Sequence, residues 1–336
     1  MHSSFTAFMH GLIDYAGLFP PAKLPLKQAF KNYLRYQNEA DVWILAKFIC
    51  PVKMLKGLLI YEKDLKDNFQ DISLTVLPSA VETRDGYLET FSEEIQEIKL
   101  FLQKMEQNIC IEALEIRIFP MLLTIDSSPS LHLFLNEIYE RLISAGISNV
   151  KIFFELNQSE HWVDKVKQFS EEIALFNQNM IENEISEQKV IGGLKLRCGG
   201  EKPENVPSPD EVAQTIHTCA VTGIPFKATA GLHHPLRHYD TALRTKVHGF
   251  LNIFGSALLA FHHQLTSSEI QSIILEEDST QFIFNGDLFQ YKQWYIHTDQ
   301  IQTLRKELVI SFGSCSFDEP REDLVELGLL NKNLND

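Results

Sequence analysis

The sequence has few of the features that mark secreted or membrane proteins. Its five cysteines are scattered and form no CxxC pair, which predicts reduced thiols in a cytoplasmic protein. It contains no run of about 18 apolar residues, so no transmembrane helix is predicted. The opening residues, MHSSFTAFMHG, lack the basic start and the apolar core of a secretory signal. We therefore expect a cytoplasmic protein with no membrane partner.

The chain also has too little positive charge for a nucleic-acid partner. It has 30 Lys and Arg residues and 45 Asp and Glu residues, which gives a formal net charge of -15. A phosphate backbone repels such a protein, so we expect no nucleic-acid binding. Hydrophobic residues make up 44% of the 336, as in ordinary globular proteins. A chain of this length can bury a large core, and α/β barrels often run this long as one domain.

What the sequence does contain is a regular alternation of short apolar runs and longer amphipathic segments. This order predicts strands and helices in turn, and favours right-handed βαβ units with a parallel sheet. The segment 208–223 has helix signals at both ends, with Ser208 as N-cap, Glu211 three residues later and Gly223 as the stop. The expected strands are 6–17, 42–52, 72–78, 109–119, 149–156, 190–198, 224–230 and 247–255. The expected helices are 86–105, 130–146, 161–180 and 208–223.

Eight strand–helix units predict a (β/α)8 TIM barrel, an α/β fold, over residues 1–262. No GxGxxG opens the chain, which disfavours an open doubly wound sheet. Residues 263–336 are more than a barrel needs, and we expect a C-terminal α+β extension packed on the barrel. Within it, 282–296 resembles β-structure, 299–309 a helix and the Gly/Ser-rich 310–320 a loop. A homo-oligomer remains open, with this extension as a candidate contact.

Charged and amide side chains interrupt the apolar strands near their carboxyl ends, where TIM barrels carry their chemistry. Residues two apart share a face of a strand, so Lys195 and Arg197 point the same way. A lysine desolvated among apolar residues has a lowered pKa and can act as a nucleophile or proton carrier. The catalytic candidates are Asp14, Glu115, Glu155, Lys195 and Lys227, and the substrate-binding candidates here are Arg197 and Asn252.

Glycines follow several of these residues, which would let backbone N–H groups approach a ligand closely. Barrels often bind phosphate in the loops near strands seven and eight. The turns after those strands therefore predict an anion site, with histidines at the rim in contact with the substrate. The further substrate-binding candidates are Gly199, Gly200, Gly231, His233, His234, Gly255 and Ser256.

Several short motifs, in the order in which they occur, resemble the deoxyribose-phosphate aldolase family of class I aldolases. The segment 13–29, IDYAGLFPPAKLPLKQA, is similar to the opening of that family. The later motifs ALEIRIFP, NVKIFFEL, GLKLRCGG and PFKATAG resemble its strands, and the likeness runs to about residue 256. The set DYAGLFPP, KLRCGG, FKATAGLHHP and GSCSFDEP is also typical of a family of bacterial proteins with no established activity.

The resemblance implies roles for the polar strand residues. It implies that Lys195 is the Schiff-base lysine, that Lys227 is the family's second lysine and that Glu115 stands where the family has a catalytic aspartate. It also implies that Glu155 corresponds to the glutamate that ends one of the family's strands. Arg197 departs from the family pattern, which has a small residue there, and the C-terminal segment has no counterpart. The resemblance therefore implies a class I aldolase-like barrel, but not deoxyribose phosphate as its substrate.

These residues favour a lyase that acts on a small anionic carbonyl compound and needs no cofactor. Lys195 would attack the carbonyl and form a Schiff base, an electron sink for the adjacent carbon–carbon bond. The ammonium of Lys227 on the next strand is expected to lower the pKa of Lys195. The three carboxylates are candidates for proton transfer, and Arg197 is suited to hold a carboxylate or phosphate.

Two alternatives stay open. In the first, the cluster His233, His234 and His238 binds a catalytic metal with nearby carboxylates, in a hydrolase or isomerase. The chain has no HxH or HExxH spacing, and we assign no metal ligand. In the second, the basic side chains of the site form an anion clamp, paired with Glu115 and Glu155, in a barrel that binds a small anion without chemistry.

Overall fold

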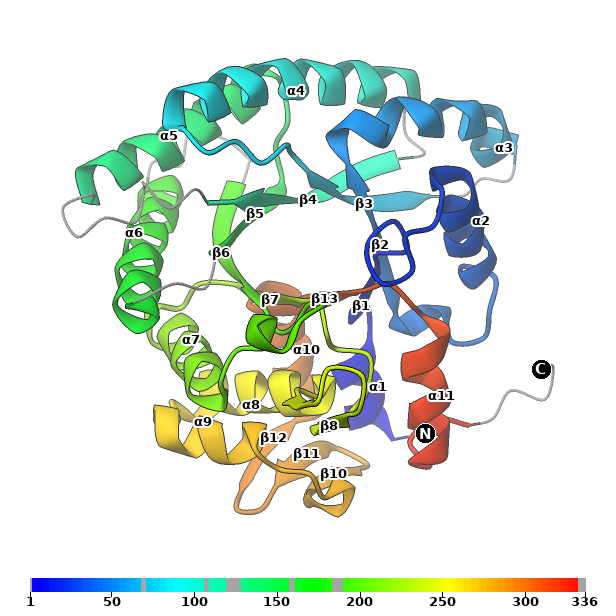
Figure 1. Ribbon diagram of the computed structural model, residues 1–336, viewed down its shortest axis with the longest axis vertical. Coiled ribbons are helices and arrows are strands. Elements are labelled where there is room, and N and C mark those ends of the chain that lie inside the picture. The colour runs from blue at the N-terminus through cyan, green and yellow to red at the C-terminus, as the bar shows by residue number, and fades with distance from the viewer. Residues whose placement is uncertain are drawn as a thin grey trace.

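The structure is a computed structural model that describes residues 2–67, 71–105, 109–118, 128–156, 161–182 and 190–331. Eight parallel strands close into a barrel in the order β1-β13-β7-β6-β5-β4-β3-β2, with helices around the outside (Figure 1). The predicted (β/α)8 TIM-barrel fold is confirmed. The barrel strands are β1 (Ile13–Tyr15), β2 (Leu45–Pro51), β3 (Ile72–Leu77), β4 (Ile109–Arg117), β5 (Val150–Glu155), β6 (Val190–Arg197), β7 (Phe226–Thr229) and β13 (Val309–Ser314).

Amphipathic helices cover the barrel because each has an apolar stripe that burial removes from water. The helix predicted at 208–223 is α7 (Pro209–Thr222), and its capping box joins Ser208 and Glu211 reciprocally. Gly223 ends it with a φ of 68°, as predicted. No helix in the described ranges is long and apolar enough to cross a membrane. The other helices that follow barrel strands are α2 (Leu26–Tyr36), α3 (Glu62–Asp67), α4 (Arg84–Met105), α5 (Ser128–Ser144), α6 (Trp162–Glu182) and α11 (Asp318–Glu326), with 3-10 helices η1 (Val42–Ile44), η2 (Val52–Tyr61) and η5 (Pro203–Asn205).

The eighth barrel strand is β13, and the prediction that residues 247–255 form it is wrong. Most of that stretch lies in α8 (Phe250–His263), whose side chains from residue 250 to 260 are all buried. A short apolar run fits a buried strand or a buried helix, and periodicity does not separate the two. The Gly and Ser residues of β13 had indicated a loop. Gly313 is instead needed because the space beside it is narrow, and a Cβ there would lie 3.0 Å from a methyl of Ile49.

A long segment between β7 and β13 leaves the barrel and then returns to close it (Figure 1). The segment 263–336 therefore contains the β-structure expected at 282–296 and the helix expected at 299–309, and also the last barrel strand. The elements of the long segment are β8 (His238–Asp240), β9 (Thr245–Val247), α8, α9 (Ser267–Ile274), η6 (Ser279–Gln281), the antiparallel sheet β10 (Phe282–Asn285), β11 (Leu288–Tyr291) and β12 (Trp294–His297), and α10 (Thr298–Glu307).

The first strand is shorter than predicted. Of the segment 6–17, only the three residues of β1 are extended, and α1 (Ser3–Met9) precedes them. The ring of Phe8 on α1 lies edge-on to Phe284 and Phe289, with centroids 5.3 Å away in both cases. Aromatic edge-to-face contacts of this kind add to the stabilisation from buried area. They join the start of the chain to the sheet formed by β10, β11 and β12.

Candidate active site inside the barrel

The strand register brings both predicted lysines to adjacent positions inside the barrel. Lys195 on β6 is the direct neighbour of Lys227 on β7 and of Glu155 on β5. Strand side chains alternate between the interior and the helix layer, and all five predicted catalytic residues are at most 8% exposed. The structure therefore brings together the five residues that the sequence singled out for catalysis.

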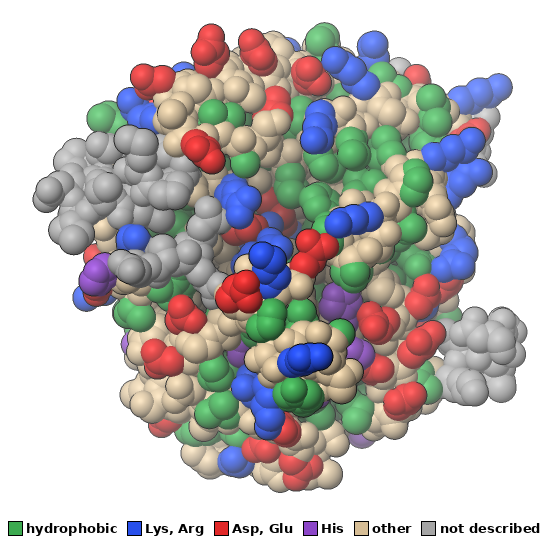
Figure 2. All heavy atoms as spheres, viewed as in Figure 1, with side chains coloured by type: hydrophobic (Ala, Val, Ile, Leu, Met, Phe, Trp, Pro, Cys, Tyr) green, Lys and Arg blue, Asp and Glu red, His purple; other side chains and the backbone are tan. Residues whose placement is uncertain are grey.

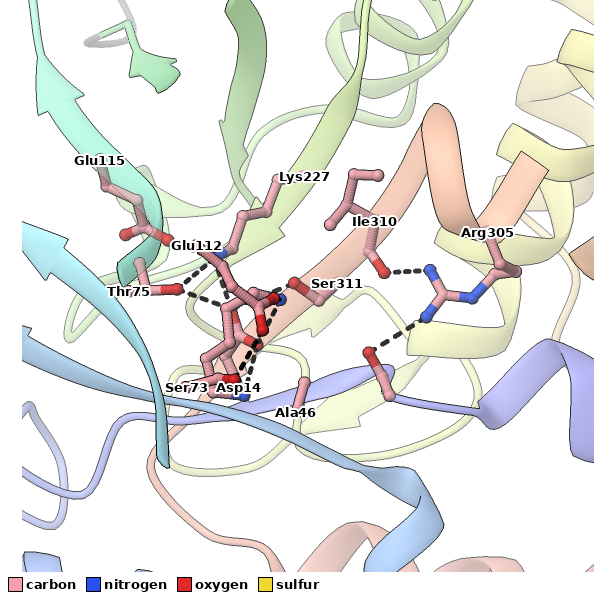
Figure 3. Close-up of polar contacts among 12 residues, drawn as sticks. Asp14, Ala46, Ser73, Thr75, Glu112, Glu115, Lys227, Arg305, Ile310 and Ser311 are labelled. Carbon is pink, nitrogen blue, oxygen red and sulfur yellow. Dashed lines mark hydrogen bonds and ion pairs between the residues drawn. The ribbon is translucent and has the colours of Figure 1, made fainter. Parts of the chain in front are cut away.

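Glu115 lies between the two lysines and pairs with both. Its Oε2 is 2.6 Å from the Nζ of Lys195, and its Oε1 is 2.5 Å from the Nζ of Lys227. Lys195 also reaches Glu155 Oε2 at 2.7 Å, and Lys227 reaches Asp14 Oδ2 at 2.5 Å. These contacts form a chain of alternating charges that crosses the barrel from β1 to β5, part of which is drawn in Figure 3. We call this chain the lysine–carboxylate network.

Asp14 is held by hydroxyl and backbone donors that sequence reasoning missed. Ser311 on β13 and Thr75 on β3 donate to its Oδ2 at 3.1 and 3.3 Å (Figure 3). The backbone N–H of Lys47 donates to Oδ1 at 3.0 Å. A single Ser or Thr in an apolar strand gives little signal by itself. Ser311 and Thr75 each lie two positions from another residue that faces the barrel interior, and this period of two is the signal that could have identified them.

The pKa values of both buried lysines are raised, which makes the predicted lowering for Lys195 wrong. Burial alone would lower the pKa of Lys195, but the carboxylates of Glu115 and Glu155 outweigh it. Burial likewise opposes the rise in the pKa of Lys227, which Asp14 and Glu115 cause. The prediction considered the effect of the Lys227 ammonium on the pKa of Lys195 but not that of the Glu115 carboxylate, which lies between the two lysines. Both lysines are therefore ammonium ions in the unliganded protein.

The three carboxylates show the opposite change. Burial would raise the pKa of Asp14, Glu115 and Glu155, yet each pKa is lowered. The main cause is Lys227 for Asp14 and Lys195 for the two glutamates. All three are therefore ionised at neutral pH, and the network holds two positive and three negative charges.

At the carboxyl ends of β6 and β7 lie Arg197 and three of the predicted glycines. Arg197 is 45% exposed at its side chain, and its Nη1 is 3.6 Å from Glu155 Oε1. Gly231 has a φ of 71°, and a Cβ on either Gly199 or Gly231 would come within 2.9 Å of the other's Cα. A Cβ on Gly200 would meet the Asn205 side chain at 2.7 Å. These glycines permit close packing of two loops beside Arg197.

Figure 2 shows the face on which these loops lie, since the loop after β1 is in front of the barrel in the matching view of Figure 1. Lys and Arg side chains gather over the centre of that face, next to Asp and Glu side chains. The carboxyl end of the barrel is thus polar above the lysine–carboxylate network, as a site for a charged ligand requires.

Two of the predicted histidines, His233 and His234, face α11. The Nδ1 of His233 is 2.9 Å from Glu319 Oε2, and the Nδ1 of His234 is 2.6 Å from Asp323 Oδ2. The Nδ1 of His238 is 2.9 Å from a backbone carbonyl. Within the described ranges, no group of three or more His, Cys, Asp or Glu side chains is placed to hold a metal. His233 and His234 thus lie between the loop after β7 and α11, the helix after β13.

Asn252, Gly255 and Ser256 do not lie at a strand end, so their predicted placement is wrong. All three are buried in α8. The amide of Asn252 accepts from the backbone N–H of Arg237 and donates to two carbonyls at 2.8 Å. Ser256 donates to a carbonyl of its own helix at 3.0 Å. These contacts are internal and leave the side chains no access to a ligand.

The fold and the site define a (β/α)8 barrel with two buried, paired lysines at its centre. A scan against models of known protein families finds no match for this chain, and a search of curated proteins finds no similar one. The geometry of the site therefore carries the functional argument.

Proposed function

We propose that this protein is a class I aldolase-type lyase, in which Lys195 forms a Schiff base with a small anionic carbonyl compound. The observation that carries the proposal is the position of Lys195, between two carboxylates and next to a second buried lysine. Buried ionisable groups with strongly shifted pKa values cluster at functional sites. The resemblance to deoxyribose-phosphate aldolases assigns the same role to the same residue.

The first step requires Lys195 to lose a proton. Glu155 and Glu115, within 2.7 Å of its Nζ, are the acceptors, and a bound substrate anion would draw Arg197 away from Glu155. The neutral amine then attacks the carbonyl carbon, and the glutamic acid returns the proton to the carbinolamine hydroxyl, which leaves as water and gives an iminium ion. One carbonyl oxygen leaves as water and one C=N bond forms. The protonated iminium has the same charge as the ammonium it replaces, so both glutamates still face a positive charge, and its single N–H donates to one of them.

The second step uses the iminium as an electron sink. A carboxylate accepts the proton of the hydroxyl on the departing fragment, the adjacent carbon–carbon bond breaks, and that fragment leaves as a carbonyl compound. The electron pair moves to the iminium and gives an enamine on Lys195. Protonation of the enamine and hydrolysis of the resulting iminium release the second product and return the lysine. In this scheme Lys227 contacts neither the carbon–nitrogen bond that forms nor the carbon–carbon bond that breaks. Its contact with Glu115 at 2.5 Å keeps that carboxylate ionised, so Lys227 is a positioning residue. Arg197 would hold the anionic group of the substrate at the barrel mouth.

Borohydride trapping tests the proposal. The protein is incubated with small aldehydes, ketones and 2-oxo acids and reduced, and the modified peptide is identified by mass spectrometry. We expect an adduct on Lys195 that disappears in Lys195→Arg and persists in the control Lys63→Arg, which changes an exposed lysine on α3. An adduct confined to surface lysines across the whole panel would refute the mechanism.

One observation favours a second candidate function, a barrel that binds a small anion without chemistry. Both lysines are fully paired and their pKa values are raised, which suits an anion clamp as well as a resting enzyme. The two functions differ in the variant Lys195→Met. An enzyme loses turnover and trapping, whereas a binding protein retains its ligand with an affinity that depends mainly on Arg197.

A further inference from the structure

A cavity of about 470 Å³ opens at the amino end of the barrel, opposite the end that carries Arg197. Its lining comes from residues that precede or begin the strands, among them Gly11, Ala46, Ser73, Asn149 and Lys151. The volume lies within the range of about 300–1,000 Å³ that small-molecule sites occupy. We call this space the amino-end cavity.

The lining of the amino-end cavity is strongly basic, although the chain as a whole has a net charge of -15. Among the described residues that line it, Glu112 is the one carboxylate, and it lies 3.5 Å from the Nζ of Lys47. Lys227, which reaches the cavity from above, is neutralised by the lysine–carboxylate network. The basic residues of the lining are Lys47, Lys151, Lys227, Arg305 and Lys306.

Arg305 is a buried cation with neutral partners. Its guanidinium donates to the carbonyls of Phe8, His10, Gly11, Val309 and Ile310, and Figure 3 shows it beside Ile310. No carboxylate of the described residues lies within ion-pair distance of it. Carbonyl dipoles satisfy its donors but leave its full charge in place. Burial lowers the pKa of Arg305 to about 9, and the charge of Asp14 opposes this.

Lys151 is the second uncompensated cation of the cavity. Its Nζ donates to the backbone carbonyl of Lys306 at 2.7 Å, and among the described residues it has no ion pair. Burial lowers the pKa of Lys151 to about 8; Lys47 and Arg305 add to this effect, while Glu307 and Glu112 oppose it. Within the part of the chain that the structure describes, neither cation is in an ion pair, and carboxylates act on them only from a distance.

We propose that the amino-end cavity binds a small dianion with a phosphate group, with Lys151 and Lys47 as donors and Arg305 as a fixed positive charge. The geometry favours a dianion because one buried cation, Arg305, and one half-buried cation, Lys151, have no ion pair among the described residues. Phosphate oxygens accept the charge-assisted bonds that ammonium groups donate. The proposal does not rest on the proposed function, although Lys227 belongs both to the lysine–carboxylate network and to the lining of this cavity.

A second cavity of about 650 Å³ adjoins this one between α1 and α10 and shares His10, Arg305 and Lys306 with it. Its other lining residues include Thr6 and Ala7 of α1 and Gln302 of α10. The uncharged part of a phosphate monoester would lie here while its phosphate occupies the amino-end cavity. Free phosphate would use the first cavity alone.

Calorimetric titration of the full chain at neutral pH and constant ionic strength tests the proposal. Inorganic phosphate and glycerol 3-phosphate are the two probes. We expect saturable binding of at least one, weakened about tenfold or more in Lys151→Met because a charge-assisted bond is lost. Tighter binding of the monoester would identify an organic phosphate as the occupant, and equal binding would identify the free anion.

One control variant and one reporter variant fix the location. Lys63→Met, at an exposed lysine outside the cavity, is the control and should bind as the parent protein does. Arg197→Ala reports any binding of the probes at the opposite end of the barrel. If Lys151→Met fails to fold, the exposed Lys306→Glu takes its place and should weaken binding severalfold. Absence of saturable binding of either probe overturns the proposal, as does binding that survives in the cavity variants but is lost in Arg197→Ala.

Discussion

Replacement of Glu115 by glutamine tests whether the lysine–carboxylate network is built as the structure shows. The change keeps the size of the side chain and removes one charge that contacts two buried ammonium groups at 2.6 and 2.5 Å. Loss of one partner from a buried ion pair costs about 3–5 kcal/mol, because the remaining charge stays desolvated. We expect a decrease of this size in the free energy of unfolding, since Lys195 and Lys227 each retain one carboxylate.

Urea unfolding followed by circular dichroism measures the effect, and the same strand provides the matched control. Glu112 has a side chain that is 49% exposed and a basic partner at 3.5 Å. Glu112→Gln should change the unfolding free energy by at most about 1 kcal/mol, because solvent screens the half-exposed carboxylate of Glu112. Equal losses in the two variants would refute the reasoning about the buried network.

A double variant separates charge imbalance from general damage to the core. Glu115→Gln combined with Lys227→Met removes one negative and one positive charge from the network. Because the two residues are in contact, we expect their effects to be non-additive, with a coupling energy of about 0.5–3 kcal/mol. The double variant should be more stable than the sum of the single losses implies. Strict additivity would mean that the two side chains do not interact in solution.

Four further predictions concern the chemistry, the pH dependence and two local features of the fold. The raised pKa of Lys195 should make borohydride trapping rise with pH by about tenfold per unit between pH 7 and 10; a plateau below pH 8 would contradict it. The pKa values of the three buried carboxylates are lowered in the folded protein. The stability that they contribute is therefore present above the pKa of these groups in the unfolded chain and should be lost below about pH 4. Melting temperatures measured over a pH series would reveal this loss. Gly231→Ala should cost about 2 kcal/mol or more in thermal unfolding, owing to its φ of 71° and the backbone of Gly199 at 2.9 Å, while Ser208→Ala should cost about 1 kcal/mol through the lost cap.

The alternation of apolar strands and amphipathic helices was enough to predict the barrel and its first seven strands. The helix α7 was predicted with both of its ends, because capping is a local interaction between residues three apart. The eighth strand was misplaced because an all-buried helix and a buried strand have the same composition. The Ser and Gly residues of β13 are explained by neighbours distant in sequence, Asp14 and Ile49, which local patterns do not contain.

The same distinction applies to the site. The sequence by itself determined that Lys195, Lys227 and three carboxylates interrupt apolar strands at equivalent positions, since a period of two assigns each to the barrel interior. Only the tertiary structure decided which carboxylate lies between the lysines, and therefore the direction in which their pKa values change. It also decided that cations from β2, β5 and α10 line one cavity at the amino end. The physical reason is that electrostatic effects depend on distances across the barrel, which closure of the strands creates and sequence spacing does not specify.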